Sequence, residues 1–344
     1  MGETTWPDVL GPLVRGDDLP PDSVEWAMSR ILEGEATDAQ IAGFALGLRA
    51  KGETPIELAA LVETMLQYSE PVDAPEGAID TCGTGGDRAG TVNVSTMAAL
   101  AAVGAGATVV KHGNRAASSQ CGSADVLEEL GVVIDLDPEG VQRCVREARI
   151  GFCFAQRFHP ALRFAAPMRR EVGVPTTFNF LGPLANPARV RRQVVGVSDP
   201  AMAERIVGTL AVLGAERAMV FYGHDGLDEL TTTTTSTVFS LVDGRVEHFD
   251  VDPVALGLDA VEREALAGGD ARANAAITRE VLAGTDGAVR DIVALNAAAA
   301  LVVAGIAGDL ADGLARAKES LESGRAGEAL DGFVAASSAA REDA

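Results

Sequence analysis

Two stretches rich in glycine and hydroxyl groups combine residue types that suit the binding of a phosphorylated ligand. The first is Gly83-Thr-Gly-Gly-Asp87, followed by Asn93-Val-Ser-Thr96, and the second is Lys111-His-Gly-Asn-Arg115 with Ser118-Ser119. Each stretch follows a short apolar run and precedes a helix-forming run. Glycines let backbone N–H groups approach an anion, and a helix N-terminus favours phosphate. Two such loops, the second with two cations, predict a site for a phosphorylated sugar.

The simpler interpretation of these stretches is a pair of glycine-rich turns with capping Ser and Asn side chains. Neither stretch is a G-x-x-x-x-G-K-[ST] loop or a G-x-G-x-x-G fingerprint. The occurrence of two anion-type loops in succession, each between a strand and a helix, favours the binding site over plain turns.

Two adjacent carboxylates, Asp228 and Glu229, follow a strand predicted at 218–222. Ligands of open α/β sheets bind beyond the carboxyl ends of the strands, so this pair is expected beside the two loops. Adjacent carboxylates repel a pyrophosphate unless a cation lies between them, and Mg²⁺ prefers carboxylates, phosphates and waters. On the residues alone, a solvated acidic turn remains an equal alternative.

The composition limits the classes of partner. The net charge of −22 disfavours non-specific binding to nucleic acid or to an anionic membrane, and it means that a polyanionic substrate needs local cations or a metal. Cys82, Cys121, Cys144 and Cys153 lack metal-ligand spacing. Together with the lack of a signal peptide, they predict reduced thiols in a cytoplasmic protein without a membrane span.

Elements that position these residues fall into two regions. Residues 1–72 are expected to form a small all-helical N-terminal domain, with capping boxes that start at Asp22, Thr37 and Thr54. A domain of this size has little core of its own, so we expect a homodimer through its apolar helix faces. Residues 76–344 are expected to form a larger α/β domain.

In that larger domain the alternation of strands and helices predicts a mostly parallel central sheet flanked by helices. Strands are predicted at 78–81, 108–110, 132–134, 150–155, 193–197 and 218–222, and a hairpin turns at Asp243-Gly244 between 237–241 and 245–249. A helix is predicted at 161–172, and residues 271–338 are expected to be helical.

The two stretches, together with Gly122-Ser-Ala-Asp125 and Gly226-Leu-Asp-Glu229, resemble the motifs of the anthranilate phosphoribosyltransferase family over nearly the whole chain. The resemblance implies a glycosyltransferase of tryptophan biosynthesis, which joins the amine of anthranilate to C1 of phosphoribosyl pyrophosphate. It also implies that a segment near 160–190 returns to the helical domain and walls the cleft.

The resemblance implies a ligand set, residue by residue. The phosphoribosyl donor would contact Gly83, Gly86, Asp87, Thr91, Asn93, Val94, Ser95, Thr96, Lys111, His112, Gly113, Asn114, Arg115, Ala116, Ala117, Ser118, Ser119 and Ser123. Anthranilate would contact Gly83, Asn114 and Arg169, and two Mg²⁺ ions would be held by Ser95, Asp228 and Glu229. One departure is Arg88, where the family usually has a small residue.

No general base is nominated, because an aryl amine is already neutral at pH 7 and positioning supplies much of the remaining work. Arg169 is expected to bind the anthranilate carboxylate, because a guanidinium matches it with two hydrogen bonds, whereas Arg170 points about 100° away on a helix. His159 is expected either to line the acceptor channel or to have a capping or core role.

Two alternatives remain open. A pyrimidine nucleoside phosphorylase-like enzyme would share the fold and the glycine loop, and phosphorolysis of thymidine or uridine would reveal it. A non-catalytic, nucleic-acid-binding relative is disfavoured by the charge of −22, and a gel shift at physiological salt would test it.

Overall fold

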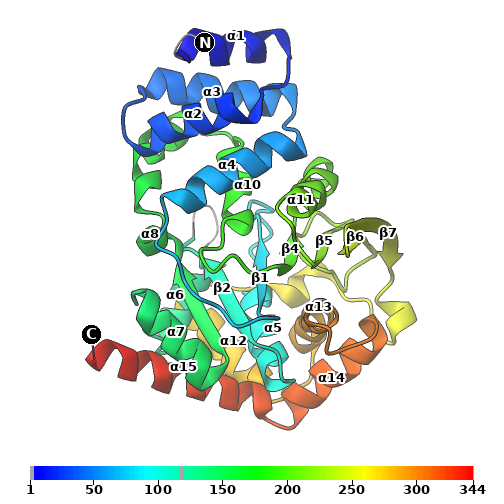
Figure 1. Ribbon diagram of the computed structural model, residues 1–344. Coiled ribbons are helices and arrows are strands. Elements are labelled where there is room, and N and C mark those ends of the chain that lie inside the picture. Colours follow the sequence, from blue (N-terminus) through cyan, green and yellow to red (C-terminus); the bar gives the residue numbers. More distant parts are fainter. Residues whose placement is uncertain (1–3, 117–119, 344) are drawn as a thin grey trace.

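The computed structural model describes residues 4–116 and 120–343, with a helical region at one end and a sheet with its covering helices at the other (Figure 1). The helical region opens with α1 (Trp6–Arg15), α2 (Pro21–Leu32), α3 (Asp38–Lys51) and α4 (Pro55–Gln67). The C-terminal helix and α1 lie at opposite ends of the molecule (Figure 1).

Helix starts in this region follow their local chemistry. Thr37 and Thr54 cap α3 and α4, and each accepts a hydrogen bond from the N–H three residues on, at 3.3 and 3.2 Å. Both predicted capping boxes are confirmed. The box at Asp22 is wrong, because α2 already begins at Pro21, whose fixed φ suits the first helical position.

The sheet has the strand order β3-β2-β1-β4-β5-β6-β7, with parallel pairing from β3 to β5 and antiparallel pairing for the last two strands. The predicted mostly parallel sheet is therefore confirmed. The strands are β1 (Ile79–Gly83), β2 (Val109–Gly113), β3 (Ile150–Phe154), β4 (Arg192–Gly196), β5 (Arg217–Gly223), β6 (Ser236–Val242) and β7 (Arg245–Val251). The hairpin turn is also confirmed, with φ of 47° at Asp243 and 78° at Gly244, as a type I′ turn requires.

Helices cover both faces of this sheet. The helices that follow α4 are α5 (Val94–Gly104), α6 (Ser123–Glu129), α7 (Pro138–Ala148), α8 (Ala155–Phe158), α9 (Ala166–Val172), α10 (Phe178–Leu181), α11 (Pro200–Val212), α12 (Ala271–Leu282), α13 (Ala288–Ala304), α14 (Leu310–Glu322) and α15 (Arg325–Glu342). Of these, α9 and α10 pack on α3 and α4 rather than on the sheet. Helices α12 to α15 confirm the predicted helical C-terminal region.

Side chains of the central strands alternate between two hydrophobic cores. Val194 and Met219 face the core that contains α5 and α13, whereas Val195 and Val220 face the core shared with α11 and the N-terminal helices. This two-sided burial is the usual state of a parallel sheet. α13 is buried along most of its length, as expected for its run of alanines.

The segment between β3 and β4 packs into the helical region. Met168 and Phe180 belong to the same core as α1–α4. Buried Glu53 joins three elements, because it accepts hydrogen bonds from Thr177 Oγ1 at 2.6 Å and from Arg205 Nη1 at 3.2 Å. The domain limits 1–72 and 76–344 nevertheless stay a prediction.

Two predicted elements are wrong. Residues 132–134 form no strand, because the N–H of Val132 bonds to Leu127 O at 2.9 Å and that of Val133 to Ser337 Oγ at 3.0 Å. The single helix at 161–172 is instead a 3₁₀ turn at Pro160–Phe164 followed by α9. Pro167 in the first turn of α9 has no N–H, so one continuous helix would lose a hydrogen bond there.

None of the helices within residues 4–116 and 120–343 combines the length and the apolar character that crossing a membrane requires.

Gly104 tests the packing of α5 against the C-terminal helices. A Cβ at Gly104 would lie 2.7 Å from the backbone nitrogen of Ala326 and would overlap Ser320 Oγ. We expect Gly104→Ala to lower the free energy of unfolding by about 1–3 kcal/mol, as overpacking does. Gly332→Ala in α15, where the nearest atom is 3.8 Å away, should instead raise it by about 0.4–1 kcal/mol. Urea denaturation of both variants measures this, and equal effects would contradict the packing described.

Candidate active site

The carboxyl ends of four parallel strands form a glycine floor. β1, β2, β4 and β5 each end in glycine, at Gly83, Gly113, Gly196 and Gly223. The loop after β5 folds back onto this floor. A Cβ at Gly196 would lie 2.5 Å from the carbonyl carbon of Asp228, and one at Gly83 would lie 3.2 Å from Asp228 Cγ. The acidic loop can occupy this place only because both positions lack a side chain.

The acidic pair thereby meets the first glycine loop and the start of α5. Asp228 Oδ2 accepts a hydrogen bond from the N–H of Gly85 at 2.7 Å. The backbone N–H of Ser95, in the first turn of α5, lies near the Glu229 carboxylate and favours its charged form. The side chain of Asp87, which belongs to the first glycine loop, lies close to the side chain of Asp228. Backbone N–H groups and carboxylates therefore alternate around one point at the edge of the sheet.

Burial and mutual repulsion perturb these carboxyl groups. Burial raises the pKa of Asp228 to about 6, and the negative charge of Asp87 adds to the rise. Burial also raises the pKa of Glu229, with Asp228 as the second cause, and the Lys111 ammonium offsets part of this shift. A divalent cation between the carboxylates would relieve this repulsion, so the donor set fits a hard metal ion.

The protein alone does not complete a metal site. Within the described ranges, no group of three or more His, Cys, Asp or Glu side chains is arranged to hold a metal ion. Mg²⁺ commonly binds through one or two carboxylates and takes its other ligands from substrate phosphates and water. Asp228 and Glu229, with the Ser95 hydroxyl nearby, suit that mode rather than a closed protein cage.

The two cations of the second loop already have protein partners. Lys111 is buried, and its ammonium donates to the carbonyl of Thr81 and to Ser95 Oγ, the latter at 3.2 Å. Arg115 donates to Asp125 at 2.9 Å and to Glu128 at 2.8 Å. Lys111 thus stabilises the neighbourhood of the acidic pair from within, and an anion that binds Arg115 must compete with two carboxylates.

The other predicted donor ligands lie along the two loops and the first turn of α5. Gly83, Gly86, Asp87 and Thr91 lie in the first loop, Val94, Ser95 and Thr96 begin α5, and His112, Gly113, Asn114, Arg115, Ala116 and Ser123 lie in or beside the second loop. Ala117, Ser118 and Ser119 fall outside the described residues. Thr96 Oγ1 is buried, and no hydrogen-bond partner for it is present among the residues described.

Two buried histidines lie behind the second loop. His112 Nδ1 is 2.9 Å from Gly182 O and His159 Nε2 is 2.8 Å from Ala185 O, so these ring nitrogens carry the protons. The ring centroids are 5.1 Å apart. Burial lowers the pKa of both, and for His112 to about 3, with His159 as the second cause. His159 therefore has a core role, and both imidazoles are neutral at pH 7.

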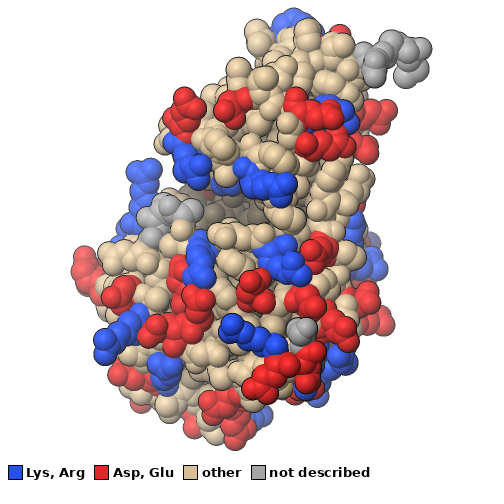
Figure 2. Space-filling model, turned by 90° about the vertical axis from the view of Figure 1, so that its left-hand side faces the viewer, with Lys and Arg blue, Asp and Glu red and all other residues tan. Residues whose placement is uncertain are grey.

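Arg169 and Arg170 differ in their surroundings. Arg169 is half-buried on α9 and Arg170 is exposed. Burial lowers the pKa of Arg169, and its side chain has neither a hydrogen bond nor an ion pair within residues 4–116 and 120–343. Figure 2 shows a hollow between the helical region and the α/β region, with Lys and Arg on both rims. A half-buried guanidinium without a partner suits an anionic ligand.

Arg88 lies in the first loop with φ of 55°, a left-handed conformation that favours glycine, and its side chain is exposed. Arg88 therefore faces solvent.

The C-terminal helices contribute residues that sequence reasoning missed. Asn274 of α12 donates to Asn93 Oδ1 at 2.9 Å and accepts from the N–H of Gly269 at 2.7 Å. Asn296 of α13 bonds to the backbone of Leu230, next to the acidic pair. Both are buried amides in alanine-rich helices. A buried polar side chain needs partners, so an amide within an apolar helical run was the available signal.

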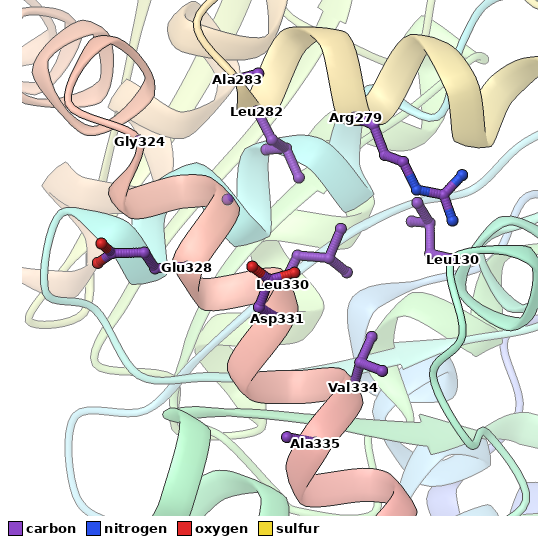
Figure 3. A pocket seen from close by; sticks show the side chains of 11 residues that line it. Leu130, Arg279, Leu282, Ala283, Gly324, Glu328, Leu330, Asp331, Val334 and Ala335 are labelled. Atoms are coloured by element: carbon purple, nitrogen blue, oxygen red, sulfur yellow. The ribbon is translucent and has the colours of Figure 1, made fainter.

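A groove of about 500 Å³ lies between α12 and α15 (Figure 3). Leu130, Leu282, Leu330 and Val334 supply its apolar wall. Nothing in the structure shows what would fill it.

Comparisons with known proteins define the class. The glycosyl transferase family helical bundle domain matches residues 7–69, and the glycosyl transferase family a/b domain matches residues 75–327. Anthranilate phosphoribosyltransferase from Nocardioides sp. is 55% identical over 97% of this chain and 99% of its own. The same enzyme from Thermus thermophilus has a TM-score of 0.91 and 40% identity, over 96% of this chain and 99% of its own.

A structure of the Saccharomyces cerevisiae enzyme in complex with PRPP and Mg has a TM-score of 0.89 and 26% identity, over 98% of this chain and 99% of that one. The chain belongs to the anthranilate phosphoribosyltransferase family. The resemblance of the motifs is thereby confirmed, and the identity over nearly the whole chain favours this family over a nucleoside phosphorylase or a nucleic-acid-binding relative.

The protonation of His112 is testable. We expect its imidazole to stay neutral, with the proton on Nδ1, as the pH falls to 5, because burial places its pKa at about 3. The unfolded-state pKa is about 6.5, so the folded protein should lose stability as the pH falls below that value. Nitrogen-15 NMR measures the tautomer, and His159→Gln assigns the signals. A titration midpoint for His112 above pH 5 would contradict the burial described.

Proposed function

We propose that the chain transfers the phosphoribosyl group of phosphoribosyl pyrophosphate to the amine of anthranilate. The products are N-(5-phosphoribosyl)anthranilate and pyrophosphate, and the reaction is the second step of tryptophan biosynthesis from anthranilate. One observation carries the proposal: Asp228 and Glu229 lie against the glycine loop and the start of α5, where backbone N–H groups and a metal-type carboxylate pair converge. The sequence identity to the named relatives supports it.

The reaction exchanges one bond at C1 of the ribose. The C1–oxygen bond breaks and its electron pair leaves on pyrophosphate, while the amine nitrogen forms a bond to C1 and then loses a proton. Backbone N–H groups of the first loop and of α5 bind the charged oxygens. Asp228 and Glu229 would hold Mg²⁺, which neutralises the charge that develops on the leaving group.

The acceptor needs positioning rather than deprotonation. Arg169 would bind the anthranilate carboxylate and turn the amine towards C1, and Gly83 and Asn114 would complete that pocket. His112 and His159 are held neutral by burial, and their protonated nitrogens already donate to backbone carbonyls. This arrangement supports a mechanism without a dedicated general base, since the aryl amine has a free lone pair at pH 7.

Several finer points are part of the proposal. The donor ligands are those predicted along the two loops and in the first turn of α5, and a second Mg²⁺ would take the Ser95 hydroxyl. Val14 and Ile56 of the helical region are 87% and 54% exposed, which supports a homodimer through it. Sedimentation velocity at micromolar concentration tests that dimer. The domain limits and a cytoplasmic location, drawn from the biosynthetic role, stay proposals.

The activity and its metal dependence are measured together. Anthranilate fluorescence should fall when the protein is incubated with phosphoribosyl pyrophosphate and Mg²⁺, and EDTA should stop this reversibly. Asp228→Ala combined with Glu229→Ala should abolish the activity and keep the fold, because these half-buried loop side chains contribute little to either core. Full activity in EDTA or in the double variant would refute the metal assignment.

Substitutions of Arg169 and of its neighbour Arg170 together test the proposed acceptor site. Arg169→Ala should raise KM for anthranilate about ten- to a hundredfold, since a charge-assisted hydrogen bond contributes about 1.5–3 kcal/mol. KM for the phosphoribosyl donor should change little, and Arg170→Ala, on the exposed side of α9, should be near neutral. Damage from Arg170→Ala, or a loss of donor affinity alone in Arg169→Ala, would show that the acceptor site is misplaced.

A further inference from the structure

We propose that Asn296 of α13 is a positioning residue for the acidic loop, which we define as residues 223–230. The inference rests on the proposed function, in which Asp228 and Glu229 of this loop hold the metal ion. Asn296 acts through the backbone of Leu230, the residue that follows Glu229. It thereby sets the affinity of the site for the complex of Mg²⁺ with pyrophosphate.

The contact between Asn296 and Leu230 holds the two peptide units that flank Leu230. Asn296 Oδ1 accepts the N–H of Leu230 at 3.0 Å, and Nδ2 donates to Leu230 O at 2.9 Å. The same Nδ2 donates to Ile292 O at 2.9 Å, within its own helix, and so holds the side chain in one orientation. Asn296 is 3% exposed and Leu230 is fully buried. A reciprocal pair of buried hydrogen bonds defines both the place and the direction of the backbone at Leu230.

Other contacts of the acidic loop come from its own ends and from neighbouring loops, where the N–H of Gly85 donates to Asp228 Oδ2 at 2.7 Å and Arg263 donates to Asp225 O at 2.5 Å. Asp225 accepts the N–H of Leu227 at 3.2 Å and the hydroxyl of Thr231 at 2.8 Å, and the N–H of Gly223 donates to Leu227 O at 2.9 Å. These bonds shape the turn, whereas Asn296 connects the turn to a helix in the core. The clamp from α13 therefore holds the backbone next to Glu229 against a buried helix, while Gly85 holds Asp228 from the first glycine loop.

Electrostatics make such a clamp necessary. Asp87, Asp228 and Glu229 are neighbouring carboxylates at one edge of the sheet, so they repel one another when no cation lies between them. Without an anchor at Leu230, the loop would relax away from this repulsion before the ion arrives. Binding of the metal ion would then have to bring the two carboxylates together again, and this costs affinity. Loss of a hydrogen bond that supports a metal ligand weakens other metal sites in the same way.

The test compares two buried hydrogen-bonding side chains. Asn296→Leu keeps the branching at Cγ and removes both bonds to Leu230. Ser320→Ala in α14 removes another buried bond, to Ala101 O at 2.8 Å, and Ser320 is hydrogen-bonded to α5 rather than to the acidic loop. Calorimetric titration with magnesium pyrophosphate measures binding, and thermal unfolding without ligand measures stability. We expect the Kd to rise about tenfold in Asn296→Leu, equivalent to about 1.4 kcal/mol, and less than twofold in Ser320→Ala.

Kinetics should also distinguish an effect on the metal site from an effect on the acceptor site. The Mg²⁺ concentration for half-maximal activity should rise in Asn296→Leu, while KM for anthranilate should not. Unchanged binding in Asn296→Leu, or an equal loss in Ser320→Ala, would overturn the inference, since the second result would mean general loosening of the core. If Asn296→Leu does not fold, Asn296→Ala is measured against the same criteria. A wild-type protein that binds no magnesium pyrophosphate would instead overturn the proposed function, and the inference with it.

Discussion

The close approach of Asp228 to Gly83 and Gly196 is the constraint on which the rest of the site depends. These two glycines are paired across adjacent parallel strands, so the register of β1 and β4 creates the space. A side chain at either position would displace the acidic loop. The same register brings the loop after β1 to the edge of the sheet where the acidic loop lies. The start of α5 follows the loop after β1 and therefore lies there as well. Strand pairing and backbone contact thus determine the site before any catalytic side chain is considered.

The charge distribution of a protein with a net charge of −22 is consistent with the metal proposed at this point. The buried ammonium of Lys111 faces inward, and Arg115 is held by two carboxylates of its own. A polyanion that binds either cation of the second loop must therefore compete with protein partners. The crowded carboxylates of the acidic loop and Asp87 can instead attract a divalent cation, which reverses the local charge.

Features with local causes could be predicted from the sequence, and features with distant causes could not. Thr37 and Thr54 cap helices with groups three residues away, and Asp243-Gly244 sets its own turn, so all three were predicted correctly. The strand expected at 132–134 failed because an apolar run does not reveal that α15 supplies its hydrogen-bond partner. The helix expected at 161–172 failed at Pro167, a local signal that was overlooked.

The same distinction applies to the site. Glycine loops, carboxylates and the helix start were visible as motifs, because each is contiguous in the sequence. The hydrogen-bond and ion-pair partners of Lys111 and Arg115 were not visible in the sequence, since they depend on the packing of neighbouring strands and helices. Asn274 and Asn296 were missed because they act on residues 181 and 66 positions earlier in the chain, and only the fold brings these together.

Those long separations have a consequence for synthesis of the protein. On a ribosome the chain emerges from its N-terminus, and contiguous units fold as they appear. Both glycine loops and the acidic loop leave the ribosome before α12 and α13, which hold them. A nascent chain therefore cannot form a finished site until the helices that carry Asn274 and Asn296 have also emerged. A chain that stops before α13 would lack both the bonds from Asn296 to Leu230 and a large part of the core that supports the sheet.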